Sequence, residues 1–280
     1  MQKTDNATPK ISVSIVTYAP NLDVLRKALS SLSAAIGYAR ARSALGESVV
    51  WIEDNGPGLI WKTRLEELLA KELTSCTASV ISGHGNIGYG RGNNLAIQRC
   101  AQDYHLVLNP DVVLEEAALF EALAFMEMHR DVGMLTPSVT GTNGERQYLC
   151  KRYPSVLDLL LRGFAPAAVK LFFHKRLEKY EMRDETGDNS MLDVPIASGS
   201  FMFFRRDDLF RAGGFAEAFF MYFEDFDLSI RIGKISRIAY VPAVKIIHYG
   251  GQAAGKGPKH IAMFIRSGFT FFMRNGWKWW

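Results

Sequence analysis

Residues 11–36, ISVSIVTYAPNLDVLRKALSSLSAAI, contain the pattern that decides the fold. The first seven residues alternate in polarity and then become continuously apolar, which is typical of a buried parallel strand. After a turn at 18–21, apolar residues recur at helical spacing, at Leu22, Leu25, Leu29, Leu32 and Ile36. We therefore expect a strand followed directly by an amphipathic helix.

The same succession repeats along the rest of the N-terminal half. Predicted strands cover residues 48–54, 77–82, 105–109 and 132–137, and predicted helices lie near 65–73, from Asn93 onward and at 115–129. Alternating strands and helices of this length predict an α/β fold. Its sheet should be Rossmann-like, doubly wound and mainly parallel, with helices on both faces.

Polar residues follow four of these elements. In a doubly wound sheet, ligands bind beyond the carboxyl ends of the strands. The positions that fall there are Thr17, Asp54, the loop 83–92 and Asp111. We expect them to lie at one edge of the sheet and to form a binding site.

The loop belongs to a glycine-rich stretch, GHGNIGYGRGNN, at residues 83–94. Because glycine permits conformations and close approaches that other residues do not, such a loop can wrap a phosphate or a sugar with its amides. The spacing matches neither the P-loop nor the dinucleotide-binding pattern. A flexible connection is the alternative, although long loops in compact domains are often functional.

Residues 106–114, LVLNPDVVL, place Asp111 just after a strand and a proline. A carboxylate at that edge of the sheet could hold a divalent cation against a diphosphate. Asn-Pro-Asp is also common in turns and before helices, so a purely structural role for Asp111 is an equal alternative.

Residues 212–230, AGGFAEAFFMYFEDFDLSI, bring an apolar run up against Glu224, Asp225 and Asp227. Burial among phenylalanines disfavours the charged form of a carboxylate and raises its pKa, unless a metal or a substrate hydroxyl compensates. A general base needs such a setting. The alternative is a helix whose acidic first turn interacts with the positive end of the helix dipole.

Further strands of the second half are predicted at 195–206, 236–242 and 243–251. The glycine and serines of the first would let a ligand approach closely. His248 ends the last strand, where a neutral imidazole near carboxylates would be a good metal ligand. A structural histidine is the alternative.

The composition, 48% hydrophobic and 22% charged, is that of a globular protein and excludes a disordered chain. A net charge of +4, without a recognition motif, disfavours nucleic-acid binding. The cysteines Cys76, Cys100 and Cys150 are too widely spaced for a disulfide framework and suit a reducing compartment. Since no signal-peptide core or membrane-spanning run is seen, we expect the protein on the cytoplasmic side.

Two segments combine apolar and basic residues. Residues 155–176, SVLDLLLRGFAPAAVKLFFHKR, predict two short amphipathic helices separated at Pro166. Residues 259–280, KHIAMFIRSGFTFFMRNGWKWW, set tryptophan beside lysine, which suits the headgroup layer of a membrane. Residues 228–280 contain nine Lys or Arg and no acid. Both segments are candidates for contact with an anionic membrane, and packing against the protein's own core or a second subunit is the alternative.

Together these stretches resemble the glycosyltransferase family 2 proteins with the GT-A fold, especially bacterial rhamnosyltransferase-like members that build polysaccharides on lipid carriers. The resemblance spans nearly the whole chain. Its ordered motifs are SIVTYAP (14–20), IEDNG (52–56), GNIGYGRGNN (85–94), LVLNPDVVL (106–114), SGSFMFFRRDDLFRAGGFAEAFFMYFEDFDLSIR (198–231) and YVPAVKIIHYGG (240–251). The chain departs from the family pattern at Pro57, where serine is usual, and at Ala216, where aspartate is usual.

The resemblance implies roles for individual residues. The nucleotide and its sugar would lie along Thr17, Tyr18, Asp54, Gly88, Arg91, Asn94 and Asn109. A divalent metal would bind at Asp111 and His248, Asp225 would be the catalytic base, and the acceptor side would include Ser198, Gly199 and Glu224.

The resemblance also divides the chain into four regions. Residues 1–138 would form the nucleotide-sugar-binding half and residues 193–250 the acceptor and catalytic half of one GT-A domain. Residues 139–192 would be an insertion with acceptor-facing or membrane-facing helices, and residues 251–280 a basic aromatic helix that associates with a membrane.

The implied activity is an inverting, Mg²⁺- or Mn²⁺-dependent hexosyltransferase of O-antigen, capsule or cell-wall polysaccharide biosynthesis. The resemblance favours dTDP-L-rhamnose as donor, with a UDP-sugar as the alternative. The implied acceptor is a polyprenyl-diphosphate-linked saccharide at the inner face of the plasma membrane. A non-catalytic sugar-nucleotide- or glycan-binding module and a nucleotidyltransferase are the alternatives from other classes, and a homo-oligomer is left open.

Overall fold

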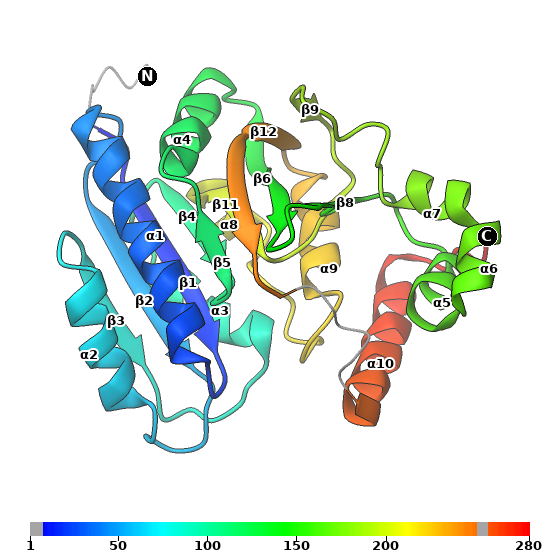
Figure 1. Ribbon diagram of the computed structural model, residues 1–280, viewed down its shortest axis with the longest axis horizontal. Coiled ribbons are helices and arrows are strands. Elements are labelled where there is room, and N and C mark those ends of the chain that lie inside the picture. The colour runs from blue at the N-terminus through cyan, green and yellow to red at the C-terminus, as the bar shows by residue number, and fades with distance from the viewer. Residues whose placement is uncertain (1–7, 251–256) are drawn as a thin grey trace.

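The computed structural model describes residues 8–250 and 257–280. The N-terminal residues 1–7 and the first part of the predicted C-terminal region, residues 251–256, lie outside this description. A central sheet has helices on both faces, and a group of helices lies at one end of the molecule (Figure 1). The predicted α/β class is confirmed.

The N-terminal half alternates strands and helices as expected. Its elements are β1 (Ile11–Thr17), α1 (Leu22–Ala41), β2 (Ser48–Asp54), α2 (Lys62–Glu72), β3 (Thr77–Ile81), α3 (Tyr89–Ile97) and β4 (Tyr104–Leu108). The side chain of Asn21 accepts hydrogen bonds from the amides of Asp23 and Val24, which fixes the start of α1 directly after the first strand. Helix α3 begins four residues before the expected Asn93, so part of the predicted glycine loop is helical.

The second half continues the same sheet. Its elements are β5 (Val112–Leu114), α4 (Ala118–Met128), β6 (Val132–Gly141), β7 (Arg146–Gln147), β8 (Cys150–Lys151), α5 (Val156–Phe164), α6 (Ala167–Phe172), α7 (His174–Tyr180), β9 (Met191–Leu192), β10 (Ile196–Ala197), β11 (Phe201–Arg205), α8 (Arg206–Arg211), α9 (Glu224–Ile232), β12 (Arg237–His248) and α10 (Gly257–Asn275). The short strand β5 separates Asp111 from the helix that was expected to follow it directly.

The strand order is β3-β2-β1-β4-β11-β6-β12-β5. Strands β3, β2, β1 and β4 are parallel, as are β6 and β12. Strand β11 lies antiparallel between β4 and β6 and joins the two halves into one sheet. The predicted mainly parallel arrangement thus holds for β3, β2, β1 and β4 and for β6 and β12. Strand β11 is antiparallel to both of its neighbours, and β5, β7 and β9 pair antiparallel at the margins of the second half.

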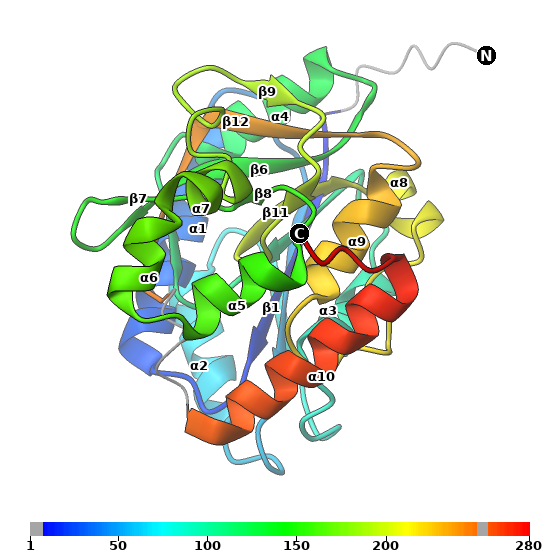
Figure 2. The ribbon, with the colours of Figure 1, turned by 90° about the vertical axis from the view of Figure 1, so that its right-hand side faces the viewer.

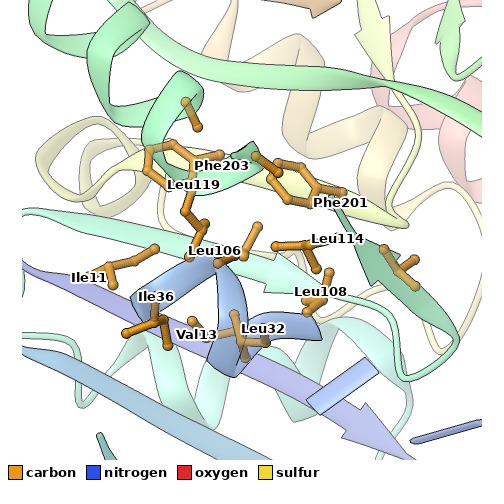
Figure 3. Close-up of a cluster of buried hydrophobic side chains, with 14 of the residues drawn as sticks. Ile11, Val13, Leu32, Ile36, Leu106, Leu108, Leu114, Leu119, Phe201 and Phe203 are labelled. Carbon is orange, nitrogen blue, oxygen red and sulfur yellow. The ribbon is translucent and has the colours of Figure 1, made fainter. Parts of the chain in front are cut away.

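Both faces of the central strands are buried and largely apolar. In β4 and β11 the side chains alternate, so Leu106, Leu108, Phe201 and Phe203 pack on the side of α1 and α4 (Figure 3). Their neighbours along the same strands, such as Val107 and Met202, pack on the side of α8 and α9. Burial on both faces explains why these strands are almost continuously hydrophobic.

The helices α5, α6, α7 and α10 gather at one end of the molecule (Figures 1 and 2). As expected, the helix breaks at Pro166, which precedes α6. Helix α10 buries Phe271 and Phe272 against Phe219 and Phe223 of the central domain. One face of the C-terminal segment therefore packs on its own chain, which was one of the two alternatives for this segment.

Candidate active site

The carboxyl ends of β1 and β2 place two of the predicted nucleotide contacts side by side. Thr17 and Asp54 are partners in the parallel register and both are buried. Oδ1 of Asp54 accepts a hydrogen bond from the amide of Gly56 at 2.9 Å, whereas its Oδ2 is covered and has no partner. The side chain of Tyr18 is 60% exposed beside them. An unpartnered carboxylate oxygen at this edge is suited to accept a hydrogen bond from a ligand.

Two glycines before and in α3 allow close packing of another segment on this helix. Gly88 has φ +92°, and a Cβ there would overlap the carbonyl oxygen of Phe220. A Cβ on Gly90 would come 2.9 Å from Cβ of Phe215. Glycine is therefore needed at both positions because residues 215–220 pack directly on α3.

The same packing engages Arg91 and Asn94. Asn94 accepts from the amide of Phe215 at 2.9 Å and donates to its carbonyl at 2.8 Å. Arg91 donates to the carbonyl of Glu217 through Nε at 3.1 Å and through Nη2 at 2.6 Å. These side chains hold the segment that leads to the acidic cluster. Their expected contact with the donor remains a prediction.

Asp111 and His248 meet at the ends of their strands. Nε2 of His248 lies 3.4 Å from Oδ1 of Asp111, and that oxygen is covered without a hydrogen bond. Nδ1 of His248 donates to Oε1 of Gln147 at 3.1 Å, so in the neutral imidazole Nε2 carries a lone pair that faces the carboxylate. Two acceptors facing each other are unfavourable unless a cation or a proton lies between them.

This arrangement fits a divalent metal. Ligand atoms that share one metal lie about 3 Å apart, and a metal-bound histidine usually donates its other N–H to an oxygen, as His248 does to Gln147. A Cβ on Gly250 would collide with Oδ2 of Asp111, so only glycine leaves this space open. Within residues 8–250 and 257–280, no group of three or more His, Cys, Asp or Glu side chains is arranged to hold a metal ion. The pair would therefore need oxygens from a ligand or from water to complete a coordination shell.

Asp225 lies in the first turn of α9, so the acidic helix start that was given as the alternative is present, and the role of Asp225 as a base stays a prediction. Its Oδ2 accepts from the amide of Gly199 at 2.8 Å, and its Oδ1 accepts from the amide of Phe226 at 2.9 Å. Burial raises the pKa of Asp225, and these amides and the hydroxyl of Ser198 lower it in part. A partly buried carboxylate whose pKa is raised and whose orientation is fixed has the properties of a general base.

Glu224 is buried beside Asp225, and its Oε2 has no hydrogen-bond partner. Burial and the adjacent charge of Asp225 raise the pKa of Glu224 to about 8. The two carboxyl groups therefore interact, and the charge of one disfavours ionisation of the other.

Tyr89 connects the strand edge with the acidic cluster. Its hydroxyl can donate to Oδ1 of Asn109 at 2.9 Å or to the carbonyl of Gly199 at 2.8 Å, and Gly199 in turn donates to Asp225. Burial and the charges of Glu224 and Asp225 raise the pKa of Tyr89 well above its ordinary value, so the phenol remains a donor. The sequence reasoning missed both Tyr89 and Gln147. Tyr89 could have been found because it lies inside the glycine-rich motif. No feature of the sequence around Gln147 points to a role in the site.

The structure therefore brings most of the predicted site residues together. Asp54, Asn109, Asp111 and His248 lie at strand ends of one sheet, and Asp225 reaches the same region from α9. Arg91 and Asn94 are the residues whose hydrogen bonds point elsewhere.

No protein-family model matches the chain. The chain is 28% identical over 208 residues to the N-acetylglucosaminyl-diphospho-decaprenol L-rhamnosyltransferase of Mycobacterium tuberculosis, a match that covers 70% of this chain and 66% of that relative. It is also 28% identical over 208 residues to rhamnosyltransferase WbbL of Escherichia coli, covering 70% of this chain and 74% of the relative. The match thus spans a little less than two thirds of the mycobacterial protein.

Solved structures share the fold at lower identity. The mannosyltransferase PcManGT of Pyrobaculum calidifontis, solved with GDP-Man and Mn²⁺, superposes with a TM-score of 0.62 at 16% identity, covering 97% of this chain and 66% of that one. TarS of S. aureus superposes with a TM-score of 0.55 at 18% identity, covering 88% of this chain and 38% of that one. These neighbours are GT-A glycosyltransferases, and the likeness confirms the predicted fold. The chain is thus a homologue of proteins named rhamnosyltransferases, and it is built on the GT-A glycosyltransferase fold.

Proposed function

We propose that the protein is an inverting glycosyltransferase that moves a sugar from a nucleotide donor onto a lipid-linked saccharide. One observation carries the proposal: Asp225, an oriented carboxylate with a raised pKa, is connected through Gly199 and Tyr89 to the strand edge that holds Asn109 and Asp111. A base and a candidate diphosphate site in one region are what a single displacement at a sugar carbon requires.

Asp225 would accept the proton of the acceptor hydroxyl as that oxygen attacks the anomeric carbon. The bond to the nucleoside diphosphate breaks on the opposite face, so the configuration inverts and no covalent intermediate is needed. Asp111 and His248 would hold a Mg²⁺ or Mn²⁺ ion, which would neutralise charge on the leaving diphosphate. Tyr89 would keep Gly199, and with it Asp225, aligned with the strand edge.

The favoured donor is dTDP-L-rhamnose. It is supported by the two relatives named as rhamnosyltransferases, whereas solved neighbours with UDP-GlcNAc or GDP-Man keep other nucleotide sugars as alternatives. The unpartnered Oδ2 of Asp54 would accept an N–H of the base, and Thr17 and Tyr18 would border the nucleotide.

The favoured acceptor is a polyprenyl-diphosphate-linked saccharide, as in the name of the mycobacterial relative. Ser198, Gly199 and Glu224 lie beside Asp225 and would form the acceptor side. The protein would work at the cytoplasmic face of an anionic membrane. Among the described residues, none of the helices has both the length and the apolar character needed to cross a bilayer.

The experiment is a binding and product assay. Calorimetry with dTDP, UDP, GDP and ADP, each with and without Mn²⁺, should show metal-dependent binding of dTDP or UDP. Incubation with the matching sugar nucleotide and an acceptor should release the nucleoside diphosphate. Release of diphosphate would instead indicate a nucleotidyltransferase, and binding without turnover would indicate a non-catalytic module.

A further inference from the structure

The turn before Asp225 has an unusual backbone. Tyr222 and Phe223 are consecutive non-glycine residues with φ +71° and +66°. Side chains are disfavoured in this left-handed region, so the surrounding structure has to hold the turn in place. Because Phe223 directly precedes α9, the conformation of this turn sets the direction of Asp225.

Helix α10 supplies much of that support. Ser267 Oγ donates to the carbonyl of Met221 at 2.7 Å, and the Tyr222 hydroxyl lies 2.8 Å from Nδ1 of His260. The ring of Phe223 packs between Phe264 and Phe271, with centroid separations of 5.0 and 5.4 Å. The inner face of α10 thus contacts the backbone of Met221, the hydroxyl of Tyr222 and the ring of Phe223.

A second set of contacts joins the end of α10 to α9. Oδ1 of the buried Asp227 accepts from Nε of Arg274 at 3.1 Å and from Nδ2 of Asn275 at 3.3 Å. Asp227 lies two residues beyond Asp225 on the same helix. Helix α10 is therefore connected to the chain on both sides of the candidate base.

The outer face of α10 is apolar and uncovered. Four side chains spaced one turn apart are 44 to 63% exposed: Ile261, Ile265, Phe269 and Met273. The exposed Trp277, Trp279 and Trp280 follow, and the backbone of 278–279 accepts hydrogen bonds from the first turn of α5. Exposed Phe164, Leu171 and Phe172 extend the apolar surface over α5, which lies beside α10, and over α6 beyond it (Figure 2). We call these outer faces of α5, α6, α10 and residues 276–280 the apolar end surface.

The charges around this surface identify its partner. Residues 257–280 contain no acid, and Lys259, Arg266 and Lys278 are exposed there. Helices α5 and α6 contain one acidic residue, Asp158, whose side chain is buried and paired with Arg176. An apolar surface that carries tryptophans, and whose exposed charges in α10 and residues 276–280 are all basic, suits an anionic bilayer. In a two-fold contact with a second copy, the same positively charged side chains would face each other and repel.

We propose that α10 has two functions on opposite faces: its outer face seats the protein on an anionic phospholipid bilayer, and its inner face holds the turn 221–223 that aims Asp225. The second part rests on the proposed function, whereas the first does not. Ser267 and His260 are then positioning residues, and the site lies next to the lipid surface from which a lipid-linked acceptor would come.

The outer face is tested by sedimentation of the full-length chain with vesicles. Vesicles of phosphatidylcholine with phosphatidylglycerol should bind the protein, and vesicles of phosphatidylcholine alone should bind it far less. Ile265→Glu combined with Phe269→Glu should abolish binding. Met128→Glu, at an exposed apolar residue of α4 outside the apolar end surface, is the matched control and should bind like the wild type. Equal binding by the double variant would overturn this part.

The inner face is tested with Ser267→Ala. Loss of its hydrogen bond should lower kcat about five- to tenfold with little change in KM for the donor, and should accelerate amide exchange across residues 221–227. Thr270→Ala, which removes a hydroxyl that bonds within α10, is the control and should change neither. Unchanged kcat and exchange in Ser267→Ala would refute the positioning role. A wild type without transferase activity would contradict the proposed function, while amide exchange and vesicle binding would still decide this inference.

Discussion

The amide of Gly199 donates a hydrogen bond to Oδ2 of Asp225 at 2.8 Å, and a Cβ at Gly199 would come 3.3 Å from the side chain of Asp225. The loop between β10 and β11 therefore contacts the candidate base directly. Since the amide of Phe226 holds Oδ1, both oxygens of Asp225 are oriented by backbone that depends on the fold of the second half.

Asp225→Asn should abolish transfer and leave nucleotide binding almost unchanged. An amide cannot accept a proton at neutral pH, and loss of a general base lowers turnover by about 10²-fold or more. Steady-state rates and calorimetry measure the two effects. Asp207→Asn, at an exposed acid in the first turn of α8, should keep full activity. Substantial turnover by Asp225→Asn would mean that another group is the base.

The rate should rise with pH over two steps. Asp225 must be ionised to act, and burial raises its pKa, so the acidic limb of kcat/KM should lie above the range of an ordinary aspartate. Because the two carboxyl groups interact and the pKa of Glu224 is about 8, the pair should titrate in two steps, and Glu224→Gln should leave one. The buried protonated form also favours folding at low pH, so this contribution to stability should decline as pH rises from about 4.5 through 8. A Glu224→Gln profile with both steps intact would contradict this assignment.

Metal-dependent binding of a nucleoside diphosphate should depend on the pair Asp111 and His248. Asp111→Asn or His248→Ala removes a metal ligand, and each should abolish the difference between titrations with and without Mn²⁺. Gln147→Ala should weaken metal affinity about 10- to 100-fold, because the ring of His248 loses the hydrogen bond that fixes its orientation and its tautomer. Asn143→Ala, in the exposed turn between β6 and β7, is a control that should bind as the wild type does.

Gly88→Ala should be much more damaging than Gly85→Ala. Both glycines have positive φ, so both variants carry backbone strain of about 1–3 kcal/mol. At Gly85 a Cβ meets nothing within 4 Å, whereas at Gly88 it would overlap the carbonyl of Phe220. The free energy of unfolding and kcat of Gly88→Ala should therefore fall well below those of Gly85→Ala. Equal losses in the two variants would show that the contact with Phe220 is dispensable.

The N-terminal half could be predicted because its information is local. Alternation in 11–17 and helical spacing from Leu22 to Ile36 each describe one element, and both elements formed as expected. The antiparallel insertion of β11 between β4 and β6 depends on pairing between distant segments, which hydrophobic periodicity does not encode.

The site could be predicted in part for the same reason. Asp54 and Asp111 follow recognisable strands, and Asp225 follows an apolar run. The partners of Arg91 and Asn94 are backbone groups of 215–217, more than a hundred residues away, so their role was not readable from the glycine-rich motif. The role of Gln147 is recognised only from the structure, because the pairing of β7 with β6 brings this side chain to His248.

Glu53 should make the protein less stable as pH rises. Its side chain is buried in β2, neither carboxylate oxygen has a hydrogen-bond partner, and burial raises its pKa well above the ordinary value. The folded state therefore holds a proton that the unfolded state releases above about pH 4.5, and the free energy of unfolding should fall by up to about 1.4 kcal/mol per pH unit until the folded pKa is reached. Glu53→Gln keeps the shape without the proton, so urea unfolding at a series of pH values should show a smaller slope than the wild type. Glu66→Gln, at an exposed position of α2, is the control and should leave the slope unchanged. If the free energies of unfolding of the wild type and Glu53→Gln change in parallel with pH, Glu53 is ionised in the folded protein.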